Sequence, residues 1–207
     1  MSSNKSVLVD YGVGNIFSIK QAVEACGHDI ELSRDPYKIK QASHVILPGV
    51  GAFSHAIEKL EGFGLAQPIR EYSQNGGNLL GICVGMQLLF SKSYEYGEHD
   101  GLDLISGSVD NIRKRNGNMR VPIIGWQAVY THENTKMFEG VDVPNFYFVH
   151  SYECLPEDKN LISSHVQIGE TNICTSISQG NTTGVQFHPE KSGKFGLKFL
   201  QNFISTK

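Results

Sequence analysis

The sequence has no long apolar run, no excess of positive charge and no closely paired cysteines. Its longest apolar stretches, residues 78–90 and 146–149, are shorter than the ~20 residues that a membrane-spanning helix requires. Lys and Arg together number 18 against 21 Asp and Glu, and the resulting net charge of −3 gives no electrostatic attraction to nucleic acid. We therefore expect partners that are neither a membrane nor a nucleic acid.

The four cysteines, at positions 26, 83, 154 and 174, show neither C-x-x-C spacing nor the density of a secreted disulfide scaffold. Residues 1–5 lead into an expected strand without the apolar stretch of a signal peptide, which favours the cytoplasm and free thiols. The sequence contains no H-E-x-x-H motif, so we expect no metal site. The glycine turn at 11–14 lacks the third glycine of a dinucleotide-binding loop, because Phe17 stands there. We expect no cofactor.

The first half of the chain alternates short apolar runs with helical patterns, as repeated βα units do. Strands are expected over residues 6–10, 30–32, 44–47 and 78–82. Asn15 is a plausible N-cap for a helix that closes at Gly27. The uninterrupted apolar run at 78–82 is typical of a strand buried on both faces of a parallel sheet.

Beyond Gly101 the segments are shorter and richer in β-forming residues. Strands, several of them antiparallel, are expected over residues 108–112, 123–130, 146–152, 161–166 and 173–179. Asn116-Gly117, inside the basic stretch 113–120, predicts a hairpin turn, and a last helix is expected over 195–204. Since no repeat or linker divides the chain, residues 1–207 are expected to form a single α/β domain.

Cys83 stands between two glycines, Gly81 and Gly85, after an expected strand and before a helical run over 86–90. This is the strand-turn-helix elbow on which many hydrolases present a nucleophile. The glycines relieve crowding so that the central side chain can stand in a sharp turn. A helix N-terminus also favours a thiolate over a thiol. Cys83 is therefore the candidate nucleophile.

A thiol nucleophile needs a base, and His188 is the best candidate among the eight histidines. If strand geometry continues through this segment, Glu190 shares a face with His188. Glu190 can then bind one imidazole nitrogen while the other faces Cys83. The sequence thus predicts a cysteine–histidine–glutamate triad.

A second glycine turn, residues 48–51, follows the expected strand at 44–47. It should lie at the same carboxyl edge of the sheet as the elbow. Attack of a thiolate on a carboxamide creates a negatively charged oxygen. Backbone amides of the Val50-Gly51 segment and of Val84 are the expected donors to that oxygen.

Five motifs occur in order: Asp-Tyr-Gly-Val-Gly-Asn at 10–15, Leu-Pro-Gly-Val-Gly-Ala-Phe at 47–53, Gly-Ile-Cys-Val-Gly-Met-Gln at 81–87, Tyr-Phe-Val-His-Ser-Tyr at 147–152 and Gly-Val-Gln-Phe-His-Pro-Glu-Lys-Ser at 184–192. Together they resemble the class I glutamine amidotransferases, and among these the glutaminase subunits of imidazole glycerol phosphate synthases. The resemblance covers nearly the whole chain. It implies a flavodoxin-like three-layer sandwich with a mixed, mostly parallel central sheet flanked by helices.

The resemblance also implies an activity, which is hydrolysis of L-glutamine to glutamate and ammonia through an acyl thioester. Cys83 would be the nucleophile, His188 the base and then the acid, and Glu190 its orienting partner. The resemblance places the glutamine pocket at Gly51, Gln87, Glu95, Ser151 and Tyr152, with the amides of Val50 and Val84 at the oxyanion. Gln87 lies four residues after Cys83, so on a helix its amide returns to the same side.

Relatives of this kind pass ammonia to a (β/α)8-barrel synthase subunit, which makes imidazole glycerol phosphate and AICAR in histidine biosynthesis. The resemblance therefore implies a heterodimer, with weak glutaminase activity in the isolated subunit and strong activity beside the loaded partner. The residues that would face the partner are Asn15, Trp126, Tyr147 and Lys191.

One stretch departs from the family pattern. The usual Pro-His-Met-Gly-Trp-Asn stands here as Pro-Ile-Ile-Gly-Trp-Gln at 122–127, in the expected partner-facing segment. The acceptor therefore stays open between histidine biosynthesis and amidination of a bacterial surface sugar by a paralogous subunit. A non-catalytic scaffold subunit and a peptidase-like or stress-protein member of the same superfamily also stay open, although the retained triad argues against the scaffold.

Overall fold

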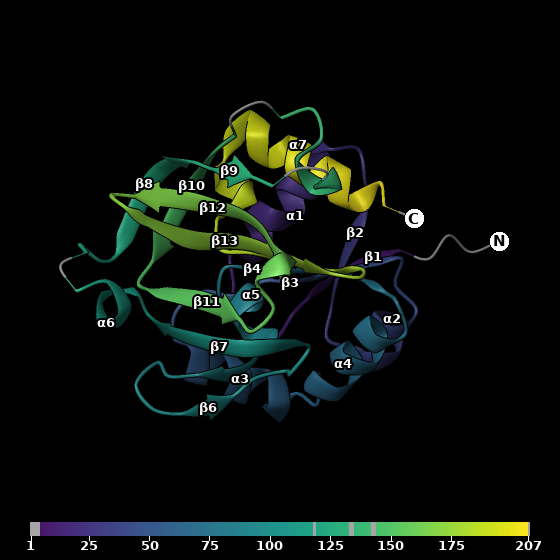
Figure 1. Cartoon of the computed structure of the whole chain (residues 1–207). Helices are drawn as coiled ribbons and strands as arrows, with labels where there is room; N and C mark the ends of the chain where they lie inside the picture. Colours follow the sequence, from purple (N-terminus) through teal and green to yellow (C-terminus); the bar gives the residue numbers. More distant parts are fainter. Residues whose placement is uncertain (1–4, 118, 133–134, 142–143, 207) are drawn as a thin grey trace.

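The computed structural model describes residues 5–117, 119–132, 135–141 and 144–206. Most of the segment 1–5, which was expected not to be a signal peptide, therefore lies outside the described residues. An eight-stranded sheet in the order β2-β1-β3-β4-β14-β13-β12-β9 runs through the centre (Figure 1). Its parallel part consists of β1 (Ser6–Val9), β2 (Ile30–Ser33), β3 (His44–Leu47), β4 (Asn78–Ile82) and β14 (Thr182–Val185). The expectation of a parallel first half is confirmed.

Helices cover both faces of this sheet, as Figure 1 shows. On one face lie α1 (Ile16–Ala25) and α7 (Gly193–Ile204), and on the other lie α2 (Pro36–Lys40), α3 (Phe53–Gly62) and α4 (Ala66–Gln74). Strands β1 and β3 are buried along their whole length because each has helices on both sides. The predicted three-layer α/β arrangement is confirmed.

The second half of the chain adds antiparallel strands, as expected. In the main sheet these are β9 (Tyr130–Thr131), β12 (Ile162–Ile168) and β13 (Thr171–Gln179). A smaller sheet contains β5 (Phe90–Ser93), β6 (His99–Asp100), β7 (Ile105–Asn111) and β11 (Tyr152–Pro156). A separate two-stranded ribbon pairs β8 (Ile123–Ala128) with β10 (Asn145–His150). Short turns of 3-10 helix cover Lys136–Phe138, Lys159–Leu161 and Pro189–Lys191.

One local prediction was wrong. The hairpin expected at Asn116-Gly117 is instead the end of a short helix, α6 (Ile112–Asn116). This helix begins because the Asn111 side chain accepts the backbone N–H of Arg113 at 2.9 Å, and it ends at Gly117, whose φ of +52° suits glycine. Helix α1 does begin after Asn15, but the Asn15 side chain makes no capping hydrogen bond.

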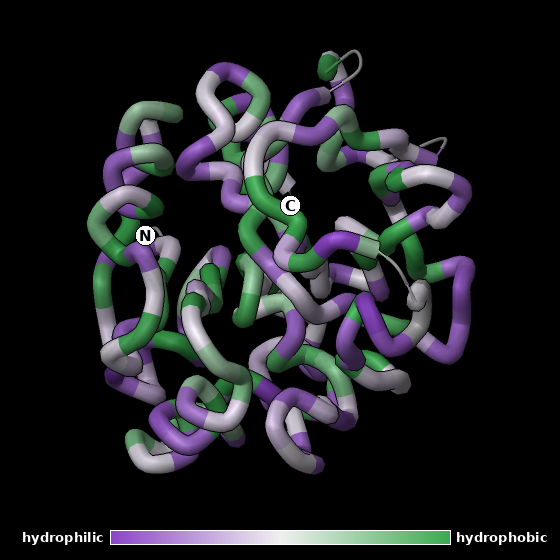
Figure 2. Tube along the Cα trace, turned by 90° about the vertical axis from the view of Figure 1, so that its left-hand side faces the viewer, coloured by the Kyte–Doolittle hydropathy of each residue, from purple (hydrophilic) through white to green (hydrophobic). Residues whose placement is uncertain are grey.

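Hydrophobic packing fixes the strands that carry the chemistry. In Figure 2 hydrophobic and hydrophilic segments are interspersed along the Cα trace. Phe187 stacks on Phe146 of β10 with ring centroids 3.9 Å apart, and it meets Phe199 of α7 edge-on at 5.4 Å. This aromatic cluster ties the end of β14 to the β8–β10 ribbon. Within the described ranges, no helix has the length and apolar character to cross a membrane.

Close backbone packing joins the two glycine turns at the carboxyl edge of the sheet. A Cβ atom at Gly49 would lie 2.5 Å from the Gly85 nitrogen and 2.8 Å from the Val84 Cβ. We expect Gly49→Ala to lower the free energy of unfolding by about 1–3 kcal/mol through this overlap. The matched control is Gly62→Ala, where nothing lies within 4 Å of the added Cβ. Urea denaturation of both variants measures the difference, and equal stability of the two would contradict this packing.

Candidate active site

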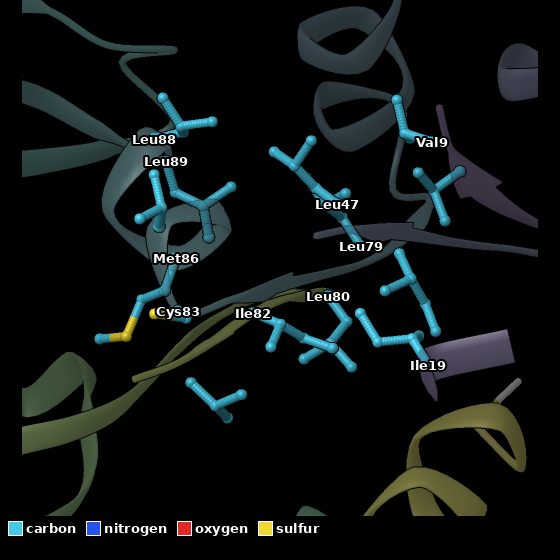
Figure 3. Close-up of a cluster of buried hydrophobic side chains, with 14 of the residues drawn as sticks. Val9, Ile19, Leu47, Leu79, Leu80, Ile82, Cys83, Met86, Leu88 and Leu89 are labelled. Carbon is cyan, nitrogen blue, oxygen red and sulfur yellow. The ribbon is translucent and has the colours of Figure 1, made fainter. Parts of the chain in front are cut away.

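Cys83 occupies a strained turn between β4 and α5 (Val84–Leu88). Its φ of +55° lies in the left-handed region that non-glycine residues rarely adopt. The turn is held because the Cys83 N–H donates to the Val185 carbonyl at 2.7 Å and the Cys83 carbonyl accepts the N–H groups of Met86 and Gln87. Figure 3 shows Cys83 where the apolar strand residues end and the helix with Met86 begins. This is the elbow geometry predicted from the sequence.

Two glutamine side chains orient the sulfur. The Gln186 amide nitrogen donates to the Cys83 Sγ at 3.6 Å, and the Gln87 amide nitrogen donates to the Gln186 oxygen at 3.1 Å. Both glutamines are buried. Sequence reasoning gave Gln87 a role but missed Gln186, although a polar residue two positions before the candidate base in a buried strand was the available signal.

His188 and Glu190 are paired, but not by the strand geometry expected from their spacing. Strand β14 ends at Val185, and His188 precedes the 3-10 turn Pro189–Lys191. This turn brings the Glu190 Oε1 within 2.9 Å of the His188 Nδ1, and the two side chains are 0% and 2% exposed. The Ser192 hydroxyl donates to the His188 carbonyl at 2.6 Å and stabilises the turn.

The protonation of His188 depends on its two partners. Burial lowers its pKa, but the Cys83 sulfur and the Glu190 carboxylate outweigh burial and raise the pKa to about 10. Cys83 and His188 also line the same cavity. The His188 Nε2 is buried and makes no hydrogen bond with the described residues. It is the nitrogen free to exchange a proton with a reacting group.

A cavity of about 420 Å³ opens over these groups. It brings together nine of the predicted site residues, which are Val50, Gly51, Cys83, Val84, Gln87, Glu95, Ser151, Tyr152 and His188. Six further residues line it, and none of them was assigned to the glutamine site in the sequence analysis: Tyr96, Asn111, Val121, Pro122, Val149 and His150. Glu190 lies behind His188 and does not line the cavity.

The glycine turn beside the cavity is fixed at both of its ends. The Tyr11 hydroxyl donates to the Pro48 carbonyl at 2.5 Å, and burial raises the pKa of Tyr11. The Glu95 Oε2 accepts the Phe53 N–H, the first of helix α3, at 2.6 Å. Burial raises the pKa of Glu95 as well. A cavity carboxylate therefore also holds the helix that follows Val50 and Gly51.

The four residues expected to face a partner lie outside the cavity, on adjoining surface around the triad. The Asn15 amide donates to the Glu190 Oε1 at 3.3 Å. The Lys191 ammonium lies 5.7 Å from the centre of the Tyr147 ring, and Tyr147 meets Trp126 edge-on at 6.3 Å. Trp126 is 52% exposed, an unusual position for so large an apolar side chain.

Two other cavities are less suited to nucleophilic catalysis. A cavity of about 540 Å³ beside the amino end of β4 is lined by no cysteine or histidine. One of about 680 Å³ contains Cys154 and Cys174, but burial raises the pKa of Cys154 well above its ordinary value, so this thiol stays protonated. Among the described residues no group of three or more potential ligands is arranged to hold a metal ion.

Comparison with known proteins agrees with this geometry. The "Imidazole glycerol phosphate synthase subunit HisH" of Moorella thermoacetica is 43% identical over 197 residues, 95% of this chain and 92% of that protein. The protein of the same name from Aquifex aeolicus is 41% identical over 201 residues, 96% of this chain and 95% of that one. "Imidazole glycerol phosphate synthase hisHF, chloroplastic" of Arabidopsis thaliana is 42% identical over 208 residues, which cover all of this chain and 35% of that protein.

Solved structures show the same fold. A crystal structure of a glutamine amidotransferase superposes with a TM-score of 0.75 at 18% identity, over 97% of this chain and 99% of that one. The structure of PurLQS from Thermotoga maritima gives 0.71 at 19% identity, over 96% of both chains. The sequence model of the family described as "Glutamine amidotransferase class-I" matches residues 7–206. This chain therefore belongs to the class I glutamine amidotransferase family.

Proposed function

We propose that this chain is a glutaminase subunit that hydrolyses L-glutamine to glutamate and ammonia. We further propose that it delivers the ammonia to a (β/α)8-barrel subunit making imidazole glycerol phosphate and AICAR in histidine biosynthesis. One observation carries this proposal: Cys83, on its elbow, lines the same cavity as His188, and the Nδ1 atom of His188 is paired with the buried Glu190. The names of the relatives from Moorella thermoacetica and Aquifex aeolicus support the synthase assignment.

The first half of the reaction forms the thioester. The raised pKa of His188 favours an imidazolium beside a Cys83 thiolate. The thiolate attacks the carboxamide carbon, and the resulting oxyanion is stabilised by backbone N–H groups of the Val50-Gly51 turn and of Val84. His188 then gives its Nε2 proton to the departing nitrogen, and ammonia leaves as the C–N bond breaks.

The second half hydrolyses the thioester. Acylation removes the negative charge of the sulfur, and that charge is one of the causes of the raised pKa of His188. The pKa of His188 therefore falls after acylation, so that the neutral imidazole can accept a proton from water. Glu190 holds the Nδ1–H throughout and keeps Nε2 directed at the reacting atoms.

The amino-acid head of glutamine requires charged and polar contacts at the other end of the cavity. Glu95 supplies a carboxylate for the α-ammonium group, while Gln87, Ser151 and Tyr152 line the remaining wall. This allocation gives a cationic partner to a carboxylate that is only 8% exposed and whose pKa is raised by burial more than it is lowered by the Phe53 N–H and His99.

Glu95→Gln separates the two roles of this side chain. Glutamine still accepts the Phe53 N–H, so the start of α3 should be preserved, whereas the charge that binds the α-ammonium is lost. We expect KM for L-glutamine to rise roughly 10-fold to 100-fold with little change in kcat, as for a lost hydrogen bond to a charged group. Glu95→Ala should in addition lower the melting temperature. An unchanged KM in Glu95→Gln would remove Glu95 from the substrate site.

The partner is proposed to bind the surface that carries Asn15, Trp126, Tyr147 and Lys191. Asn15 links this surface directly to the triad because its amide donates to Glu190. Ile124 extends the surface, since it is 58% exposed and lies beside Gly125 and Trp126 on β8. Ile124 belongs to the stretch that departs from the family pattern.

We expect weak glutaminase activity from the isolated chain and strong activation by the ligand-loaded barrel subunit. Glutamate release, which does not depend on whether the barrel subunit consumes the ammonia, should be measured for the chain alone, with the barrel subunit, and with the barrel subunit plus its nucleotide substrate. Equal turnover in all three samples would contradict the coupling. Activation by a barrel protein that amidinates a surface sugar, and not by the histidine-pathway barrel, would reassign the acceptor.

The chain as a whole, residues 1–207, is proposed to act as one domain, which the continuous central sheet from β2 to β9 supports. The cytoplasm is proposed as the compartment because the reaction needs the Cys83 sulfur reduced, and all four cysteines are free thiols.

A further inference from the structure

His150 is a second histidine in the cavity, and the two half-reactions of the triad make no use of it. It ends strand β10, is 6% exposed and lines the same cavity as Cys83 and His188. Its ring packs against Phe148 with centroids 5.7 Å apart. A catalytic role for His150 rests on the proposed glutaminase function.

The hydrogen bonding of His150 fixes its tautomer. The Nδ1 atom lies 2.8 Å from the Tyr152 carbonyl oxygen, which can only accept, so Nδ1 carries the proton. Burial, and to a lesser extent His188, lower the pKa of His150 to about 4, so the ring is neutral at physiological pH. The Nε2 atom is therefore a hydrogen-bond acceptor, and it is buried without a partner among the described residues.

An unpartnered buried acceptor costs free energy unless a bound molecule supplies a donor. The Nε2 of His188, which lines the same cavity, also lacks a partner in the described part of the chain. The two rings are close enough for His188 to lower the pKa of His150, yet no hydrogen bond joins them. After acylation, when the His188 ring is neutral, both Nε2 atoms are acceptors, and a small molecule that donates one hydrogen to each can lie between them. Water has this property.

We propose that the Nε2 atom of His150 accepts a hydrogen bond from the water molecule that hydrolyses the glutamyl thioester on Cys83, and so orients this water for deprotonation by His188. The water oxygen bonds to the thioester carbon while one proton passes to the His188 Nε2. The C–S bond then breaks, the sulfur leaves with the electron pair as a thiolate, and His188 keeps the proton, which restores the thiolate–imidazolium pair. The second proton, held by His150 during attack, stays on the new carboxyl group and passes to solvent.

The role concerns the second half-reaction because His150 cannot replace His188 as the acid in the first. A ring that is neutral with Nε2 unprotonated has no proton to give to the leaving ammonia. Removing the Nε2 acceptor should therefore slow thioester hydrolysis more than thioester formation. This distinction separates a water-orienting residue from one that only supports the cavity wall.

Two variants test the inference with a matched change in geometry. His150→Asn keeps an amide N–H that can donate to the Tyr152 carbonyl but has no atom at the Nε2 position. His150→Gln reaches that position with an amide oxygen that can accept. Ammonia leaves on acylation and glutamate on hydrolysis. Quenched-flow time courses of the full chain, with the barrel subunit holding an unreactive analogue of its nucleotide substrate so that ammonia is not consumed, therefore resolve the two steps.

For His150→Asn we expect a burst of about one equivalent of ammonia followed by glutamate release slowed on the order of 10-fold to 100-fold, the range for one hydrogen bond that orients the reacting water. His150→Gln should recover part of this loss. Equal slowing of both products, or no slowing, would overturn the inference while the proposed function stands. A wild-type chain that releases neither product would overturn the proposed function itself.

A partition measurement keeps the test valid if a variant is partly unfolded. Hydroxylamine competes with water for the thioester, and the ratio of γ-glutamyl hydroxamate to glutamate does not depend on the fraction of folded protein. We expect this ratio to rise in His150→Asn and to return toward the wild-type value in His150→Gln. The same ratio in all three proteins would overturn the inference.

Discussion

Replacing Cys83 by alanine is expected to reduce the release of ammonia and glutamate from L-glutamine by at least ~10⁴-fold, the order of loss when a triad nucleophile is removed. The reaction passes through a bond to this sulfur, and no second cysteine is among the residues described as lining the cavity. The measurement is a steady-state glutaminase assay with the loaded barrel subunit. Both products are followed, so that loss of coupling is not mistaken for loss of chemistry.

The matched control for this prediction is Cys26→Ala. Cys26 is a free thiol that is partly exposed at the end of α1 and lies outside the cavity. Its removal should leave the rate within a factor of about two of wild type, as surface substitutions usually do. A Cys83→Ala rate within about 10-fold of wild type would contradict the proposed mechanism, as would an equal loss in both variants.

Glu190→Gln is expected to lower kcat on the order of 10³-fold to 10⁴-fold while leaving the fold intact, the range found when the carboxylate of a triad is made neutral. Glutamine fits the space but cannot neutralise an imidazolium, so the pKa of His188 falls and less of the thiolate–imidazolium pair forms. The pH–rate profile should show this as a shift of the limb that reports His188 toward lower pH. A profile that superposes on that of the wild type would contradict the role of Glu190.

The same substitution should change how stability depends on pH. In the folded protein the Cys83 and Glu190 charges, against the effect of burial, raise the pKa of His188 from 6.5 to about 10. The folded state therefore holds this proton more tightly than the unfolded state does. This contribution is fully present below pH 6.5 and is lost as the pH rises toward 10.

Urea denaturation across that pH range measures the effect. The wild type should lose stability steadily between pH 6.5 and 10, and Glu190→Gln should show a flatter dependence. Glu98→Gln is the control because Glu98 forms an exposed ion pair with Lys92 and should contribute little. Parallel curves for wild type and Glu190→Gln would contradict the proposed ion pair.

The layers of the fold were predictable because apolar runs such as residues 78–82 are readable in the sequence. The elbow was also predictable, since the glycines at positions 81 and 85 mark a turn so tight that a Cβ at either would overlap the neighbouring backbone. The pairing of His188 with Glu190 was expected, but from a continuing strand, which the structure does not show. A 3-10 turn brings them together, and the proline at position 189 was the available signal for the end of the strand.

Contacts between distant segments were the part that spacing could not supply. The sequence places Gln186 near His188, but only the fold brings its amide to the sulfur of Cys83 and to Gln87. Asn15 is the N-cap residue of α1, as expected, but its side chain donates to Glu190, 175 residues further along the chain, and makes no capping hydrogen bond. The tautomer of His150 likewise depends on where the Tyr152 carbonyl lies, which no periodicity encodes.

The most direct test of the central claim is covalent labelling with a glutamine analogue that carries an electrophilic chloroketone in place of the carboxamide. Mass spectrometry of the digested protein should find one equivalent of label, on Cys83 alone, with labelling suppressed by excess L-glutamine and slowed in His188→Ala. Label on Cys26, Cys154 or Cys174 instead, or labelling of Cys83 at a rate indifferent to glutamine and to His188, would contradict a glutamine site built around a Cys83–His188 pair.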